Sequence, residues 1–213
     1  NAGSIETIID DGGLFTAPAP GPDDLILTTG ADTFAPTAVD STVTGTADTL
    51  NAADDLDAGT GTDALILYGG GTLNLNTPVD VDGFEEVQLV NLTNETANLT
   101  LRSGVSHDQV TINSVGTTRI NTNGSTYVTN VTGGSGNETI FLYGASNIGY
   151  ANLGDGSNHV RLRGTGGISD LQTGSGLDRL YVYSTSAWSG VTSFDGGGGS
   201  NDRLRFFQSS ATF

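Results

Sequence analysis

The stretch that decides the fold is Gly134-Ser-Gly-Asn-Glu-Thr-Ile-Phe-Leu142. It returns 20 residues later as Gly154-Asp-Gly-Ser-Asn-His-Val-Arg-Leu162, and again as Gly174-Ser-Gly-Leu-Asp-Arg-Leu-Tyr-Val182. A fourth copy, Gly198-Gly-Ser-Asn-Asp-Arg-Leu-Arg-Phe206, follows after a step of 24 residues. A fixed period of this length indicates coils stacked on copies of themselves. The sequence therefore predicts an all-β, right-handed parallel β-solenoid, similar to a β-roll or β-helix, with coils of roughly 20 residues.

Apolar residues keep the same 20-residue step in four series, which we expect to form buried rows through the stack. Each row would place one residue of every coil directly above its counterpart. The series are Val128, Ile148, Ile168 and Trp188; Val131, Ala151, Leu171 and Val191; Ile140, Val160 and Leu180; and Leu142, Leu162 and Val182.

Charge divides the chain unevenly. The net charge is -17, and residues 1–101 contain 17 Asp and Glu but no Lys or Arg, whereas residues 102–213 contain seven acidic residues and seven Arg. We therefore divide the chain into an N-terminal extension with a Pro-rich linker (1–23), an acidic portion of the solenoid (24–101) and a regular repeat portion (102–213). The acidity disfavours nucleic acid as a partner. No apolar run is long enough to cross a bilayer, so we expect no membrane insertion.

The glycine-rich turns resemble the nonapeptide G-G-x-G-x-D-x-U-x of the RTX (repeats-in-toxin) family of secreted bacterial proteins. Gly174-Ser-Gly-Leu-Asp178-Arg-Leu180 and Gly59-Thr-Gly-Thr-Asp63-Ala-Leu65 match it best. In that family such turns form a β-roll that binds Ca²⁺ through carboxylates and backbone carbonyls, so the resemblance implies calcium-dependent folding outside the cell. The Asp position varies here between copies, however, and Asn hydrogen-bond ladders could close some turns instead of metal.

The acidic portion resembles a recurring segment of RTX-containing bacterial S-layer and large surface adhesin proteins, over roughly residues 25–90. The matching stretches are Leu27 to Phe34, Val43 to Asn51 and Asp54 to Asp63, followed by Gly83-Phe-Glu-Glu-Val-Gln-Leu89. The two resemblances together imply calcium ligands at Asp32, Asp48, Asp54, Asp57, Gly59, Gly61, Asp63, Glu138, Asp155, Asn158, Asp178, Asp195 and Asp202. The alternative is that these residues serve only as turn formers and caps.

A second hypothesis concerns the outward side of the repeats, where aromatic and Arg side chains alternate from coil to coil. One row would hold Phe141, Arg161, Tyr181 and Arg205, and its neighbour Tyr143, Arg163, Tyr183 and Phe207. Guanidinium groups at this spacing can stack on aromatic rings. The face is then either a binding platform for sugar or protein, or a ladder that stabilises the sheet itself.

No nucleotide loop, nucleophile motif or zinc pattern is present, so an enzyme is not expected. The sequence favours a secreted, calcium-binding structural module of a bacterial cell-surface protein, with other copies or domains of that protein as partners. The alternative is a non-catalytic carbohydrate-binding accessory module that uses the aromatic and Arg face to hold polysaccharide.

Overall fold

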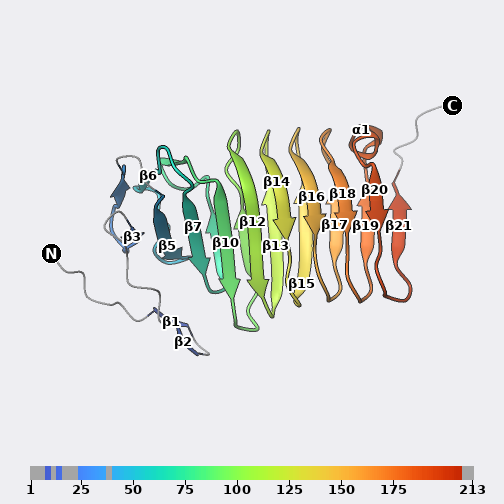
Figure 1. Ribbon diagram of the computed structural model, residues 1–213, viewed down its shortest axis with the longest axis horizontal. Helices are drawn as coiled ribbons and strands as arrows, with labels where there is room; N and C mark the ends of the chain where they lie inside the picture. Colours follow the sequence, from blue (N-terminus) through green and yellow to red (C-terminus); the bar gives the residue numbers. More distant parts are fainter. Residues whose placement is uncertain (1–7, 11–12, 16–23, 37–39, 208–213) are drawn as a thin grey trace.

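The computed structural model describes residues 8–10, 13–15, 24–36 and 40–207 of the chain. It confirms the predicted class: parallel strands wind into a β-solenoid of about 9 turns with about 21 residues per turn. The coils follow one another along a single axis, so the molecule is elongated (Figure 1). A single five-residue helix, α1 (Thr185–Ser189), is found in the described residues.

One wall of the solenoid is a nine-stranded parallel sheet that contains one strand from every coil. Its strands are β3 (Leu25–Ile26), β5 (Thr42–Thr46), β7 (Ala64–Tyr68), β10 (Glu86–Asn91), β12 (Ser106–Ser114), β14 (Tyr127–Thr132), β16 (Asn147–Asn152), β18 (Ile168–Gln172) and β20 (Ser193–Asp195). This sheet crosses the expected division at residues 101 and 102 without a break, so the acidic and the regular portions belong to one stack.

The remaining strands form two further parallel sheets. A seven-stranded sheet, which we call the second wall, contains β8 (Gly71–Asn74), β11 (Ala97–Thr100), β13 (Thr117–Thr122), β15 (Asn137–Leu142), β17 (His159–Leu162), β19 (Arg179–Val182) and β21 (Arg203–Phe206). A three-stranded sheet in the first coils contains β4 (Thr33–Phe34), β6 (Asp55–Asp57) and β9 (Asp80–Asp82). The third coil supplies a strand to each of the three sheets.

The buried core consists of apolar rows that run along the axis, because every coil places equivalent residues in register. Ile120, Ile140, Val160, Leu180 and Leu204 pair in sequence across β13 to β21, and Leu142, Leu162 and Val182 form the neighbouring row. All of these except Leu204, which lies on the last coil, are buried. Burial of about 25 cal/mol per Å² of apolar surface makes these rows the main source of stability.

Two of the predicted rows are wrong at their last member. Val128, Ile148 and Ile168 stack as expected, but Trp188 lies in α1 instead of in a strand. Leu171 pairs with Phe194 and not with Val191. The physical reason is the insertion that lengthens this coil: α1 occupies the extra residues and displaces the following strand by three positions.

The glycine turns stack so closely that no side chain fits between them. A Cβ atom at Gly156 would lie 1.8 Å from the carbonyl oxygen of Gly136, and one at Gly176 would lie 1.8 Å from that of Gly156. Gly156 also has φ +93°, which residues with a side chain rarely adopt. The 20-residue glycine repeat is therefore a requirement of coil-on-coil packing.

At the N-terminus, β1 (Ile8–Asp10) and β2 (Gly13–Phe15) form an antiparallel pair within the predicted extension. The Pro-rich linker predicted at Ala17 to Pro22 lies outside the described residues. The segment from Thr49 to Asp55 consists of turns and the start of β6.

Candidate functional site

The acidic residues of the predicted calcium turns lie at the start of the second wall and point into the solenoid. Glu138 is two residues before the buried Ile140, and because strand side chains alternate between faces, both lie on the inner face. The register places Thr118, Glu138, Asn158, Asp178 and Asp202 one above another. Thr118, Glu138, Asn158 and Asp178 are completely buried. We call these five residues the interior polar row.

Most members of the interior polar row accept a hydrogen bond from the coil before. Asn158 Oδ1 accepts the backbone N–H of Glu138 at 2.9 Å, and Asp178 Oδ1 accepts that of Asn158 at 2.7 Å. Asp202 Oδ1 accepts the N–H of Asp178 at 3.0 Å. Asn158 Nδ2 also donates to the Gly154 carbonyl at 3.1 Å. A hydrogen-bond ladder therefore links these turns from coil to coil.

Glu138 differs from Asn158, Asp178 and Asp202, because neither of its carboxylate oxygens has a hydrogen-bond partner although the side chain is fully buried. The hydroxyl oxygens of Ser114 and Thr118 are also buried without a partner. Burial raises the pKa of Glu138 from 4.5 to about 8, because the charged form loses its hydration. Burial also raises the pKa of Asp178, although the hydrogen bond that it accepts from the Asn158 backbone N–H acts in the opposite direction.

In the acidic portion, two of the predicted ligands occupy the same type of position. Asp54 is buried and accepts the backbone N–H of Asp32 at 3.1 Å and that of Asn51 at 2.8 Å. Asp63 is buried and accepts the N–H of Ser41 at 2.8 Å through Oδ1, while its Oδ2 has no hydrogen-bond partner.

The other predicted ligands lie at the surface or bind locally. Asp32 is nearly buried and accepts the N–H of Thr28 at 2.7 Å, whereas Asp48, Gly59 and Gly61 are exposed. The exposed Asp57, Asp155 and Asp195 accept backbone N–H groups from Gly59, Ser175 and Gly197, respectively. The Ser175 hydroxyl and N–H lower the pKa of Asp155. Among the described residues, no three His, Cys, Asp or Glu side chains converge on a common point for a metal ion.

Sequence reasoning named Asp57 as a ligand, but it missed the two outward rows of carboxylates on the three-stranded sheet to which Asp57 belongs. Asp55 pairs in register with Asp80, and Asp57 with Asp82, so each pair lies on adjacent parallel strands about 4.8 Å apart. The Asp-x-Asp spacing of both strands, 55/57 and 80/82, was the available signal. We call these four residues the acidic wall. Arg102 forms an ion pair with Asp80 at 3.2 Å, the one ion pair found within the described residues.

The predicted outer rows form as expected on the second wall. Phe141, Arg161, Tyr181 and Arg205 pair in register across β15, β17, β19 and β21. The Arg161 guanidinium lies 5.2 Å from the Phe141 ring centroid and 5.8 Å from that of Tyr181. These distances fall within the range of cation–π contacts.

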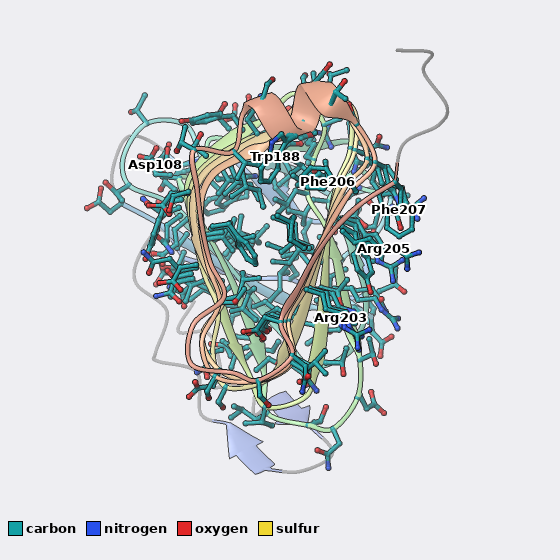
Figure 2. The ribbon with its side chains drawn as sticks, turned by 90° about the vertical axis from the view of Figure 1, so that its right-hand side faces the viewer. Asp108, Trp188, Arg203, Arg205, Phe206 and Phe207 are labelled. Carbon is teal, nitrogen blue, oxygen red and sulfur yellow. The ribbon has the colours of Figure 1, made fainter. Side chains whose placement is uncertain are left out.

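The neighbouring row packs more tightly. Arg163 lies 4.5 Å from the Tyr183 ring centroid, and Arg205 lies 4.5 Å from that of Phe207. The Tyr183 and Phe207 rings stack at 4.5 Å with an interplanar angle of 6°. Arg203, Arg205 and Phe207 project from this wall in Figure 2, on the opposite side of the solenoid from Asp108. The ring faces therefore contact one another and the guanidinium groups along the axis.

No family, no curated protein and no solved structure matched this chain. Among the described residues, no helix has the length and apolar character needed to cross a membrane.

Proposed function

We propose that this chain is a calcium-stabilised structural module of a secreted bacterial cell-surface protein, of the S-layer or large adhesin type. The observation that carries the proposal is the acidic wall within a continuous nine-coil stack. Asp55 lies over Asp80 and Asp57 over Asp82, and Arg102 is the one cation paired with them. A fold built from repeated coils suits a spacer that presents faces, and it requires no catalytic group.

Calcium fits the chemistry of the acidic wall. Stacked carboxylates repel one another, and a divalent cation between neighbouring strands relieves this repulsion while it accepts several oxygen ligands. Three of the four side chains are exposed and Asp80 is half-buried, so water can complete the coordination shell. Weak sites, with dissociation constants on the order of 10⁻⁴ to 10⁻³ M, suffice outside cells. Binding to the folded state alone then stabilises the acidic coils.

The test is a calcium titration at low ionic strength of protein from which a chelator has removed bound calcium. The titration is monitored by far-UV circular dichroism and thermal unfolding. We expect the β signal and the melting temperature to rise with millimolar calcium, and magnesium not to replace it. The double variant Asp57→Asn, Asp82→Asn should lose most of this response. Asp108→Asn is the matched control, because Asp108 is an exposed carboxylate on β12, outside the acidic wall. A chelated protein that is as folded and as stable as the calcium-loaded protein would refute the proposal.

The carbohydrate-binding alternative is less well supported. Sugar rings bind to proteins by stacking on open aromatic faces, but Tyr183 has Arg163 and Phe207 against its ring. The contacts favour a ladder that stabilises the sheet. Under the alternative, Tyr181→Ala and Arg161→Ala would abolish sugar binding, whereas under our proposal they change only stability or assembly.

A further inference from the structure

Six of the seven Arg residues gather on the second wall, at or beside its outward positions. We call them the basic face: Arg119, Arg161, Arg163, Arg179, Arg203 and Arg205. The outward positions of β13, β15, β17, β19 and β21 contain no Asp or Glu. Within the described residues none of these six guanidinium groups forms an ion pair. A chain with a net charge of -17 thus carries one surface that is purely cationic.

Two further observations show that the positive charges are crowded. Arg179 and Arg203 occupy adjacent strands in register. Arg179 Nη1 donates a hydrogen bond to Nε2 of His159 at 2.8 Å, so the imidazole accepts it in the neutral form. The pKa of His159 is lowered, first by burial and then by the positive charges of Arg179 and Arg161. Like charges held this close are stabilised by an anionic partner.

The aromatic residues between the arginines decide which groups of the basic face an anionic partner can contact. The Tyr183 and Phe207 rings stack on each other and on Arg163 and Arg205, so the ring faces are covered. Stacking also holds the guanidinium groups in place. The basic face therefore offers charge and N–H donors, which match carboxylates, more than it offers open ring surface.

The acidic wall of the same chain has the complementary chemistry. Its carboxylates repeat from strand to strand at the same spacing of about 4.8 Å as the guanidinium groups of the basic face, because both are set by parallel strand pairing. Arg102, bound to Asp80, already shows that a guanidinium group fits this wall.

We propose that the basic face of one copy binds the acidic wall of a second copy. The acidic wall and five of the six arginines of the basic face are separated within one molecule, because β6 and β9 belong to the first coils whereas β17, β19 and β21 belong to the last (Figure 1). Contact between two different patches is heterologous, so it continues from copy to copy and builds chains or rings instead of a closed dimer. The inference rests on the proposed structural role, which it deepens by naming the two surfaces through which copies meet. Calcium bound at the acidic wall would occupy the same carboxylates, so association is measured both with calcium and with chelator.

A charge-exchange experiment tests the inference. The first variant carries Arg163→Glu, Arg203→Glu and Arg205→Glu, three exposed positions. The second carries Asp55→Lys, Asp57→Lys and Asp82→Lys, which are also exposed. Sedimentation velocity is measured for each protein alone and for the mixture, at about 20 mM and about 500 mM salt, because screening separates ionic association from apolar association. Asp108→Lys, on the opposite wall, is the control for a change of charge alone.

We expect the wild type and Asp108→Lys to associate at low salt and to dissociate at high salt. Each multiple variant alone should stay monomeric, and an equimolar mixture of the two should associate again, because one then supplies two acidic surfaces and the other two basic surfaces. Measurements are made with calcium and with chelator, in every condition in which circular dichroism shows folded protein. A folded wild type that stays monomeric at low salt overturns the inference even if calcium binds. Binding of added alginate to the basic face without self-association would also overturn it.

Discussion

Replacement of Glu138 by Gln is expected to stabilise the protein at alkaline pH. The side chain is fully buried, and neither carboxylate oxygen has a hydrogen-bond partner. Gln has almost the same shape and carries no charge at any pH, and its amide can donate to a neighbouring hydroxyl such as that of Thr118, whose Oγ1 is buried without a partner. The substitution therefore removes the cost of ionising a buried group without opening a cavity.

The size and the pH range of the effect follow from the pKa of Glu138, which is about 8 in the folded protein against 4.5 for an ordinary Glu. Below pH 4.5 the carboxyl is protonated in both the folded and the unfolded chain, so its contribution to the free energy of unfolding is fully present. Between pH 4.5 and 8 only the unfolded chain releases the proton, so the free energy of unfolding falls as pH rises. Each pKa unit corresponds to about 1.4 kcal/mol, and the total loss is on the order of 3–5 kcal/mol.

The assay is urea unfolding of the wild type and of Glu138→Gln between pH 4.5 and 9. The two proteins should differ little at pH 4.5, and Glu138→Gln should be more stable by on the order of 3 kcal/mol at pH 9. Glu95→Gln is the control, because Glu95 is exposed and its removal should leave the pH profile of the wild type unchanged. If the difference between wild type and Glu138→Gln is the same at every pH, the buried carboxyl does not titrate as argued. If calcium abolishes the difference at pH 9, Glu138 binds metal instead of a proton.

Two further substitutions test the packing of the coils and the outer ladder. Gly156→Ala should lower the free energy of unfolding by about 2–4 kcal/mol, because its Cβ would overlap the Gly136 carbonyl, whereas Gly198→Ala should be nearly neutral because no atom lies within 4 Å of that Cβ. Equal effects in chemical denaturation would contradict the proposed coil spacing. Tyr183→Ala should cost about 1–2 kcal/mol through lost contacts with Arg163 and Phe207, and an unchanged melting temperature would show that the ladder contributes nothing to stability.

The fold could be predicted from the sequence because coil-on-coil packing repeats at fixed positions. Ile140, Val160 and Leu180 are 20 residues apart, and each lies in register over the next. The prediction failed where an insertion changes the coil length. Nothing in the local pattern around Trp188 and Val191 indicates that α1 takes up the extra residues and that Phe194 replaces Val191 in the row.

The residues of the candidate site could be predicted from the sequence better than their arrangement could. Glu138, Asn158 and Asp178 were predicted as calcium ligands of the turns by resemblance to calcium-binding repeats, without a statement of which way they point. The two-residue alternation with Ile140, Val160 and Leu180 was already in the sequence, and it places them on the inner face. Burial and the choice of hydrogen-bond partner, in contrast, depend on the coil before and the coil after, and a single repeat does not contain that information.

In the interior polar row, the length of a side chain decides whether its carboxylate reaches the backbone N–H of the coil before. Asp178 and Asp202 are short enough for Oδ1 to reach the backbone N–H of the coil before, at 2.7 and 3.0 Å. Glu138 is one methylene longer, and its carboxylate does not bind the N–H of Thr118 in the coil before, since both of its oxygens lack partners. The ladder that begins at Asp202 therefore ends at the Glu138 N–H. A buried polar group without a partner is costly, and ionisation of the Glu138 carboxyl adds to this cost, so we expect this coil to lose stability as the pH rises.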